Sequence, residues 1–242
     1  SSFILFYCNS NRPVITCINI SINNNKTILY GDEASPPVRF VAMTAAVLNI
    51  QLKFHEIDLF KEENKSEFYK KVNPLQKVPA LSIGNDVICD SHAIALYLCR
   101  LKNNELYPHD LFVKSKIDQM MYFNAGFLFP IDSDIFTNFF AGQESVTGRN
   151  LTKWYSALDY LELNLNEHKY LADDKMRLCD LCCGTTVSSL QLLVPLSERH
   201  QKVDTWLKSL QEHSCFNINA RGMTRLQNLV NIVRTTNKYL GV

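Results

Sequence analysis

The chain has 242 residues, of which 25 are lysine or arginine and 24 are aspartate or glutamate, so its formal net charge is +1. This length allows one large domain or two small ones, and a hydrophobic share of 46% predicts a buried core. So small a net charge creates no field that attracts nucleic acid or an anionic membrane, and we exclude nucleic acid as a partner.

Residues 1–25 are rich in asparagine, serine and isoleucine, and we interpret them as an N-terminal extension of unknown role. The apolar run Phe3–Cys8 is too short for a secretory signal and has no basic residues ahead of it. The longest apolar runs also fall short of the roughly 20 residues that cross a bilayer. We therefore expect no membrane span.

The next segment alternates between strand and helix patterns. Lys26–Tyr30 predicts a strand and Gly31–Ser35 a loop, and the prolines that follow suit the first positions of a helix, where an N–H group is not needed. The further predictions are a strand at 53–58, a short helix or loop at 62–72, a hairpin of 78–83 and 86–89, and a helix from Ser91. This order is the thioredoxin-like arrangement, which we assign to residues 26–103.

A polar linker, Lys102–Asp110, precedes a second part with helical patterns only. These patterns occupy residues 112–141, 151–168, 178–195 and 201–211. Strands followed by runs of helices indicate two domains, α/β and then all-α. We assign the all-helical domain to residues 111–236.

Eight cysteines raise the alternatives of disulfides and of a metal site. Most lie in apolar periodic stretches without framework spacing, which favours free thiols packed as small hydrophobic groups in a reducing cytoplasm. Cys179, Cys182 and Cys183 resemble a metal cluster, but one-turn spacing on a helix explains them, and no second Cys/His pair completes a tetrahedral site. We predict no metal and a cytoplasmic location.

Ser35 stands before the first predicted helix, where redox enzymes of this arrangement carry Cys-x-x-Cys, so the chain itself cannot exchange disulfides. A serine hydroxyl can instead donate a hydrogen bond to a bound thiolate. Together with the positive helix end, this bond lowers a thiol pKa by about one to two units. The alternative is that Ser35 merely caps the helix.

Two further elements follow Ser35 along the chain. A cis proline at Val78-Pro79 would turn the preceding backbone toward an extended peptide, and an edge-strand proline without a ligand is the alternative. Asp90-Ser91 begins a helix, whose free N–H groups suit a carboxylate, while Asp90 can pair with an ammonium group. Helix capping by Asp90 is the alternative. The three elements together predict a site for a small thiol tripeptide.

The runs Ser35–Arg39, Asn73–Pro79 and Asp90–Ile94 resemble the glutathione site of insect delta/epsilon-class glutathione S-transferases, and the similarity covers roughly residues 26–233. The resemblance implies the cytosolic fold of that family, glutathione as cosubstrate, a homodimer, and Ser35 as the catalytic thiol activator. It also implies a set of glutathione-binding residues: Gln76, Val78, Pro79, Asp90, Ser91 and His92.

Two positions depart from the family pattern. Gln76 stands where the family usually has a histidine near the glycyl carboxylate, which predicts that this contact is weaker or absent. Arg177 replaces a Ser/Thr helix cap three residues before Asp180. Losing such a cap typically costs about 1 kcal/mol, so we expect an effect on stability and none on chemistry.

Asp132 lies in an aromatic-rich helical stretch. Its neighbours three and four positions away are all apolar, namely Leu128, Phe129, Ile135 and Phe136, whereas Asp134 has more polar neighbours. An unpaired carboxylate is costly in apolar surroundings. Its partner is therefore a ligand hydroxyl, an internal group, or solvent at a helix kinked by Pro130.

The stretch Phe127–Asp134 resembles the same helix in the Noppera-bo glutathione S-transferases, which are linked to ecdysteroid biosynthesis. The resemblance implies that Asp132 accepts a hydrogen bond from a steroid hydroxyl, although Pro130-Ile131 replaces a basic pair. The hydrophobic pocket is then formed by Pro36, Leu59, Phe60, Phe129, Ser133 and Phe136. We thus predict a glutathione S-transferase with a site for a steroid-like apolar molecule. The alternatives are a general detoxifying transferase and a non-catalytic binding module with the same fold.

Overall fold

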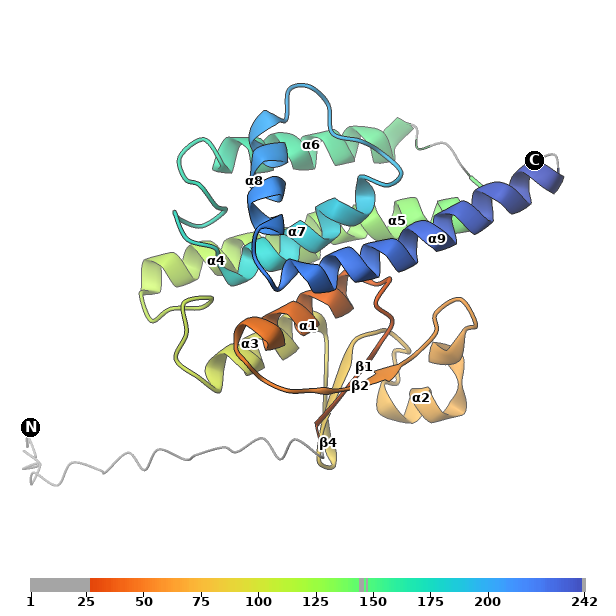
Figure 1. Cartoon of the computed structure of the whole chain (residues 1–242), viewed down its shortest axis with the longest axis horizontal. Coiled ribbons are helices and arrows are strands. Elements are labelled where there is room, and N and C mark those ends of the chain that lie inside the picture. Colours follow the sequence, from red (N-terminus) through yellow and green to blue (C-terminus); the bar gives the residue numbers. More distant parts are fainter. Residues whose placement is uncertain (1–26, 144–145, 147, 241–242) are drawn as a thin grey trace, which may run out of the picture.

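A computed structural model describes residues 27–143, 146 and 148–240 of the chain, the last four by their backbone alone. The extension that we predict at residues 1–25 lies outside the described residues. Figure 1 shows a small sheet with its helices, followed in sequence by a layer of longer helices.

The sheet has four strands in the order β2-β1-β3-β4. They are β1 (Thr27–Gly31), β2 (Lys53–Glu56), β3 (Ala80–Ile83) and β4 (Asp86–Cys89). Strand β1 pairs in parallel with β2 and antiparallel with β3, and β3 and β4 form the predicted hairpin. Leu29 and Leu81 lie opposite each other in the central pair, and both are buried.

Three helices and one short turn complete the N-terminal part: α1 (Pro36–Val47), the 3-10 turn η1 (Glu63–Lys65), α2 (Glu67–Val72) and α3 (Ser91–Arg100). Helices α1 and α3 lie between the sheet and the C-terminal helices (Figure 1). One face of α1 is buried and includes Val38, Val41 and Ala45. The thioredoxin-like order of elements is therefore confirmed.

The C-terminal part is helical, as predicted: α4 (Leu111–Phe123), η2 (Asn124–Leu128), α5 (Phe129–Phe140), α6 (Gly148–Asn164), α7 (Leu178–Leu190), α8 (Gln201–Gln211) and α9 (Phe216–Leu240). The stretch that we predicted as one helix, 112–141, contains a π-helical turn, η2, between α4 and α5. Pro130 follows in the first turn of α5, where its missing N–H costs little. Helices α6 and α7 end earlier than predicted.

Helix α9 is the largest element that the sequence-based prediction missed. Its buried face is only partly apolar: Asn219 and Gly222 are buried in the first turns, and the apolar residues Leu226 and Val230 are buried further along. Gly222 packs so closely against the loop before α1 that an added Cβ would lie 2.2 Å from the carbonyl oxygen of Glu33. Glycine therefore permits this approach of α9 to the N-terminal part.

Helix α7 is buried along almost its whole length. All the cysteines in the described part of the chain are free thiols: Cys89, Cys99, Cys179, Cys182, Cys183 and Cys215. Among the residues with described positions, no group of three or more potential metal ligands is found. No helix of this described part is long and apolar enough to cross a membrane.

The start of α7 shows how the chain compensates for the missing cap. The Arg177 side chain accepts no cap hydrogen bond, but the Asp180 carboxylate accepts a 2.7 Å bond from the Arg177 N–H. The Arg177 guanidinium instead binds Asp173 and the main-chain carbonyl of Glu105. Arg177 thus provides no side-chain cap, as expected. It forms ion pairs with Asp173 and Glu105 in neighbouring loops instead.

Candidate active site

Two cavities meet at the N-terminus of α1. The α1–α5 cavity has a volume of about 550 Å³ and is lined by Ser35, Pro36 and residues of α5. The β3–α3 cavity has a volume of about 390 Å³ and lies between Pro37, the start of β3, the start of α3 and helix α7. Phe129 lines both cavities, so the two cavities lie next to each other beside the first turn of α1.

The α1–α5 cavity brings together the residues predicted for a hydrophobic ligand. Its lining includes Pro36, Leu59, Phe60, Phe129, Asp132, Ser133 and Phe136. The ring of Phe60 meets that of Phe140 edge-on, with centroids 5.0 Å apart, and this contact joins the loop after β2 to α5. Ser35 lines the same cavity, so the predicted thiol activator faces the predicted ligand site.

Ser35 is half-buried and occupies the position before α1. Its main-chain carbonyl accepts hydrogen bonds from the N–H groups of Val38 and Arg39, both at 3.2 Å. Its hydroxyl accepts no capping hydrogen bond from the helix. The capping alternative is therefore not realised by this side chain, and the hydroxyl is available to a ligand.

Asp132 is only 4% exposed, whereas Asp134 is exposed, as the helical spacing predicted. Its Oδ1 atom has no hydrogen-bond partner in the described structure, so the alternative of an internal partner is not realised for that oxygen. Burial raises the pKa of Asp132 to about 7, and the positive charge of Arg39 opposes this rise. This carboxyl can therefore exist in either protonation state near neutral pH.

The β3–α3 cavity brings together five of the six residues predicted to hold glutathione. They are Val78, Pro79, Asp90, Ser91 and His92. The Val78–Pro79 peptide bond is cis, as the predicted site requires. Gln76 is not among the lining residues; its φ is 56°, and its carbonyl accepts a hydrogen bond from the Asn64 side chain.

Asp90 does cap α3, which was one of its two predicted roles. Its Oδ1 atom accepts hydrogen bonds from the N–H groups of His92 at 2.9 Å and Ala93 at 3.0 Å. The side chain nevertheless lines the cavity and remains 66% exposed. Capping by one oxygen thus leaves the other oxygen accessible to a ligand.

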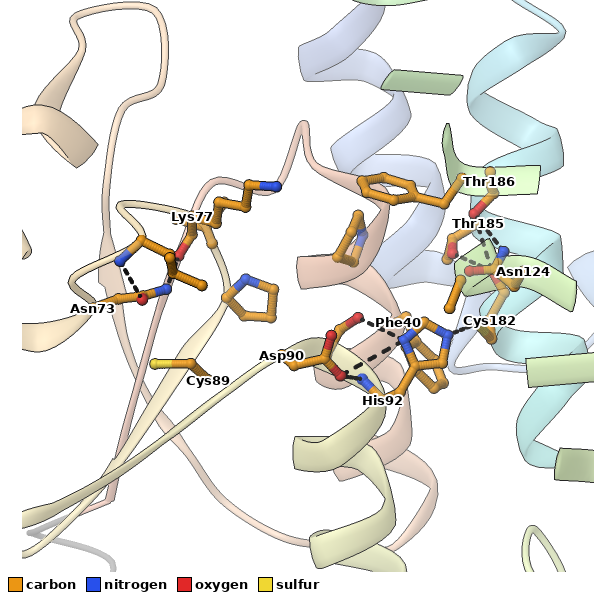
Figure 2. A pocket seen from close by; sticks show the side chains of 17 residues that line it. Phe40, Asn73, Lys77, Cys89, Asp90, His92, Asn124, Cys182, Thr185 and Thr186 are labelled. Carbon is orange, nitrogen blue, oxygen red and sulfur yellow. Dashed lines mark hydrogen bonds and ion pairs between the residues drawn. The ribbon is translucent and has the colours of Figure 1, made fainter. Parts of the chain in front are cut away.

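His92 lies between Asp90 and a thiol that the sequence-based prediction did not assign to the site (Figure 2). Its Nε2 atom lies 3.2 Å from Cys182 Sγ, and its Nδ1 atom lies 3.4 Å from Ser91 Oγ. Burial lowers the pKa of His92, against the effect of Asp90, and burial raises the pKa of Cys182 well above its ordinary value. The neutral imidazole of His92 can thus accept a hydrogen bond from the Cys182 thiol, and this bond orients the ring.

Helices η2 and α7 supply further polar groups that the sequence-based prediction missed. Asn124 donates a 2.9 Å hydrogen bond to Thr186, and both line the cavity with Thr185 (Figure 2). On the opposite wall, Lys77 lines the cavity near Asn73 (Figure 2). The signals in the sequence were an asparagine inside an apolar helix and a lysine within the Asn73–Pro79 run.

Comparisons with known proteins agree with this geometry. Residues 29–105 match the glutathione S-transferase N-terminal domain family. Glutathione S-transferase 1 of Manduca sexta is 31% identical over 186 residues, which cover 74% of this chain and 85% of that protein. An epsilon-class glutathione S-transferase from the housefly is 34% identical, with a TM-score of 0.81 over 86% of this chain and 98% of that one.

A second solved structure adds a ligand to the comparison. It is a glutathione transferase homologue from Drosophila mojavensis with bound glutathione, 32% identical, with a TM-score of 0.80 over 85% of this chain and 96% of that one. Sequence, fold and site thus agree over most of the chain. The chain belongs to the glutathione S-transferase family of enzymes, within its insect delta/epsilon class.

Proposed function

We propose that this enzyme activates the glutathione thiol through Ser35 and takes a steroid-like apolar ligand in the α1–α5 cavity. The observation that carries the proposal is that two side chains line one cavity: Ser35, whose hydroxyl makes no capping bond, and Asp132, whose buried Oδ1 atom has no hydrogen-bond partner in the described structure. Its volume of about 550 Å³ lies within the range typical of small-molecule sites, about 300–1,000 Å³.

Glutathione fits the β3–α3 cavity in an extended form, with its thiol at the α1 end. Its cysteinyl backbone would pair with the main chain of Val78. Its γ-glutamyl carboxylate would meet the Ser91 hydroxyl at the N-terminus of α3, and its ammonium group the free oxygen of Asp90. The sulfur would then pass the prolines of α1 and reach Ser35.

Ser35 acts in this proposal as a hydrogen-bond donor to the thiolate. A free thiol has a pKa of about 8.5, so little of it is ionised at neutral pH. A hydroxyl donor and the N-terminus of the 12-residue helix α1 both stabilise the anion in preference to the thiol. The thiol proton leaves to solvent, and the sulfur then attacks the electrophilic carbon of the second substrate. As the C–S bond forms, either a leaving group departs from that carbon with its bonding electron pair, or the electron pair of an activated double bond shifts away from it and takes up a proton from solvent.

Lys77 is proposed to hold the glycyl carboxylate, because it lines the cavity and Gln76 does not. We expect Lys77→Met to raise the KM for glutathione about threefold to tenfold, as a partly exposed ion pair is lost, with little change in kcat. A glutathione ester blocked at the glycine should show no such effect. The control is Lys71→Met at an exposed position. An equal rise in KM for the ester would contradict this assignment.

Asp132 is proposed to accept a hydrogen bond from a steroid hydroxyl. We expect Asp132→Asn to weaken binding of a hydroxysteroid about tenfold, because a charge-assisted hydrogen bond becomes a neutral one. Calorimetric titration measures the affinity, and Asp134→Asn is the matched control, since Asp134 is exposed on the same helix. Equal affinities in the wild type and Asp132→Asn would contradict the steroid-anchor role.

The same interaction should depend on pH. Because the pKa of Asp132 is about 7, the carboxyl is neutral at pH 6 and ionised at pH 8. The ionised form accepts the hydroxyl hydrogen more strongly, so the affinity should rise severalfold through this window. Arg39 is the neighbouring charge that favours ionisation. The Asp132→Asn variant should show no such rise.

General detoxification is the second candidate function. Phe60, Phe129, Phe136 and Phe140 give the α1–α5 cavity aromatic walls that suit flat electrophiles of several kinds. Comparable turnover of many electrophiles, without steroid binding, would favour it. A non-catalytic role is less well supported, because Ser35 lines a cavity large enough for a substrate.

We also infer a cytoplasmic homodimer. Leu111, Phe112 and Tyr122 of α4 are large apolar side chains exposed on one helix, and a second copy of the chain would cover such a surface. The free cysteines in the described part of the chain suit a reducing compartment.

A further inference from the structure

We propose that Arg225 of α9 clamps the loop Gly31–Ser35 and thereby acts as a positioning residue for the thiol activator, an inference that rests on the proposed role of Ser35. Helix α9 runs past the first turn of α1 (Figure 1), so a side chain from the C-terminal end of the chain reaches this loop.

The clamp is built around Asp32, which is fully buried. Its Oδ1 atom accepts hydrogen bonds from Ala34 N at 2.9 Å and Arg225 Nε at 2.7 Å. Its Oδ2 atom accepts from Leu59 N at 3.1 Å and Arg225 Nη2 at 3.0 Å. The main-chain carbonyl of Asp32 accepts from Ser35 N at 2.9 Å. One carboxylate thus ties the Ser35 loop, the loop after β2 and α9 together.

Arg225 also balances negative charge near the site. It lies 3.1 Å from Glu56 and 3.7 Å from Asp58, in addition to its two bonds to Asp32. Without Arg225, the carboxylates of Asp32 and of Glu56 at the end of β2 would lose this positive charge, while Asp58 would keep its ion pair with Lys61 at 3.1 Å. Their negative charge would then act on a thiolate bound at Ser35. Like charges raise the pKa of an acid, so they would oppose ionisation of the glutathione thiol.

The rest of α9 keeps Arg225 in register with the loop. Gly222, one turn earlier, allows close contact with the main chain at Glu33. Asn219 accepts a 2.9 Å hydrogen bond from Arg39, which in turn donates to the carbonyls of Glu33 at 2.9 Å and Ala34 at 2.6 Å. The loop carbonyls are thus also held by a side chain that α9 fixes. A misplacement of about 1 Å at a catalytic group can cost a hundredfold in rate, so such a fixed loop matters for chemistry.

The test uses the full-length chain and glutathione. The ultraviolet absorbance of the thiolate, followed against pH, gives the pKa of the bound thiol. We expect Arg225→Gln to raise this pKa by about one unit, which means tenfold less thiolate at a pH below it. At that pH kcat should fall by a similar factor, and the KM for glutathione should change less. An unchanged thiol pKa in folded Arg225→Gln would overturn the proposal.

Arg221→Gln is the matched control. Arg221 lies on the same helix and binds Glu33 of the same loop, but this ion pair is exposed and such pairs contribute little. We expect no change in the thiol pKa for this variant. An equal rise of the thiol pKa in both variants would show that the loss of any positive charge from α9 has this effect. That result would overturn the specific role of Arg225.

Two further measurements cover loss of folding and failure of the proposed function. If Arg225→Gln does not fold, Arg225→Lys keeps the charge but not the paired Nε and Nη2 bonds, and we expect a smaller rise, about threefold less thiolate. An unshifted thiol in folded Arg225→Lys would overturn the clamp. If Ser35→Ala leaves the thiol pKa unchanged, the proposed role of Ser35 is wrong. Hydrogen exchange of the Ala34 and Leu59 amides then tests the clamp by itself, and we expect faster exchange in Arg225→Gln. Unchanged exchange rates would contradict the clamp.

Discussion

Ser35→Ala should lower kcat/KM for glutathione conjugation about tenfold at pH 6.5, because the loss of the donor raises the thiol pKa by about one unit, while the N-terminus of α1 keeps its share of the effect. The Ser35 hydroxyl makes no capping bond that would have to be replaced, so the substitution should leave the fold intact. The loss of activity should become smaller as the pH rises above the pKa of the free thiol, because the sulfur then ionises without a hydrogen-bond donor. Steady-state rates with a chromogenic electrophile over a range of pH provide the measurement.

The control for this prediction is Ser209→Ala. Ser209 is also half-buried, but it lies on α8, and its hydroxyl donates only to the carbonyl of Trp206 in the described structure. We expect its pH–rate profile to match that of the wild type. A Ser35→Ala enzyme with wild-type kcat/KM at pH 6.5 would show that another group activates the thiol.

Asp180→Ala should lower the free energy of unfolding by about 3–5 kcal/mol, since it leaves several buried donors without partners. Asp180 is fully buried and accepts from Leu171 N at 3.0 Å, Arg177 N at 2.7 Å and Trp206 Nε1 at 2.9 Å. It therefore joins the loop before α7 to α8. Burial raises the pKa of Asp180 to about 6, and these hydrogen bonds limit the rise.

Urea unfolding of Asp180→Ala and Asp180→Asn measures this contribution. The asparagine keeps one oxygen acceptor and should lose less stability than the alanine. Asp134→Ala, at an exposed position of α5, should stay within about 0.5 kcal/mol of the wild type. An unfolding midpoint for Asp180→Ala equal to that of the wild type would contradict the structural role.

Local sequence patterns predicted the parts of the site that depend on neighbouring residues. The apolar residues three and four positions from Asp132 predicted its burial, and the structure confirms it because the helical spacing places Asp132 on the same face of the helix as these apolar neighbours. The order of strands and helices around Ser35 was confirmed for the same reason, as each element has its own pattern and boundary residues.

Long-range packing could not be predicted in this way. Phe129 lines both cavities because the start of α5 and the start of α1 border the same space, and no local pattern shows that these two segments come together. Helix α9 was missed because its inner face begins with Asn219 and Gly222, which serve a buried arginine and a close backbone contact rather than an apolar core. The later spacing of Leu226 and Val230 was the available signal.

Gln76 and Arg177 show two features of the structure that the family pattern does not contain. The positive φ of Gln76 belongs to a backbone conformation that sequence does not reveal, and its neighbour Lys77 lines the cavity instead. At Arg177, the family pattern indicates a lost cap, but the long side chain reaches Asp173 and Glu105, groups that lie outside the motif.

A crystal structure with glutathione and a hydroxysteroid is the most direct test of the arrangement that we propose. We expect the sulfur within hydrogen-bond distance of Ser35 Oγ, the peptide along Val78 and the start of α3, and the steroid hydroxyl on Asp132. A glutathione sulfur directed away from Ser35, or a steroid bound outside the α1–α5 cavity, would contradict it.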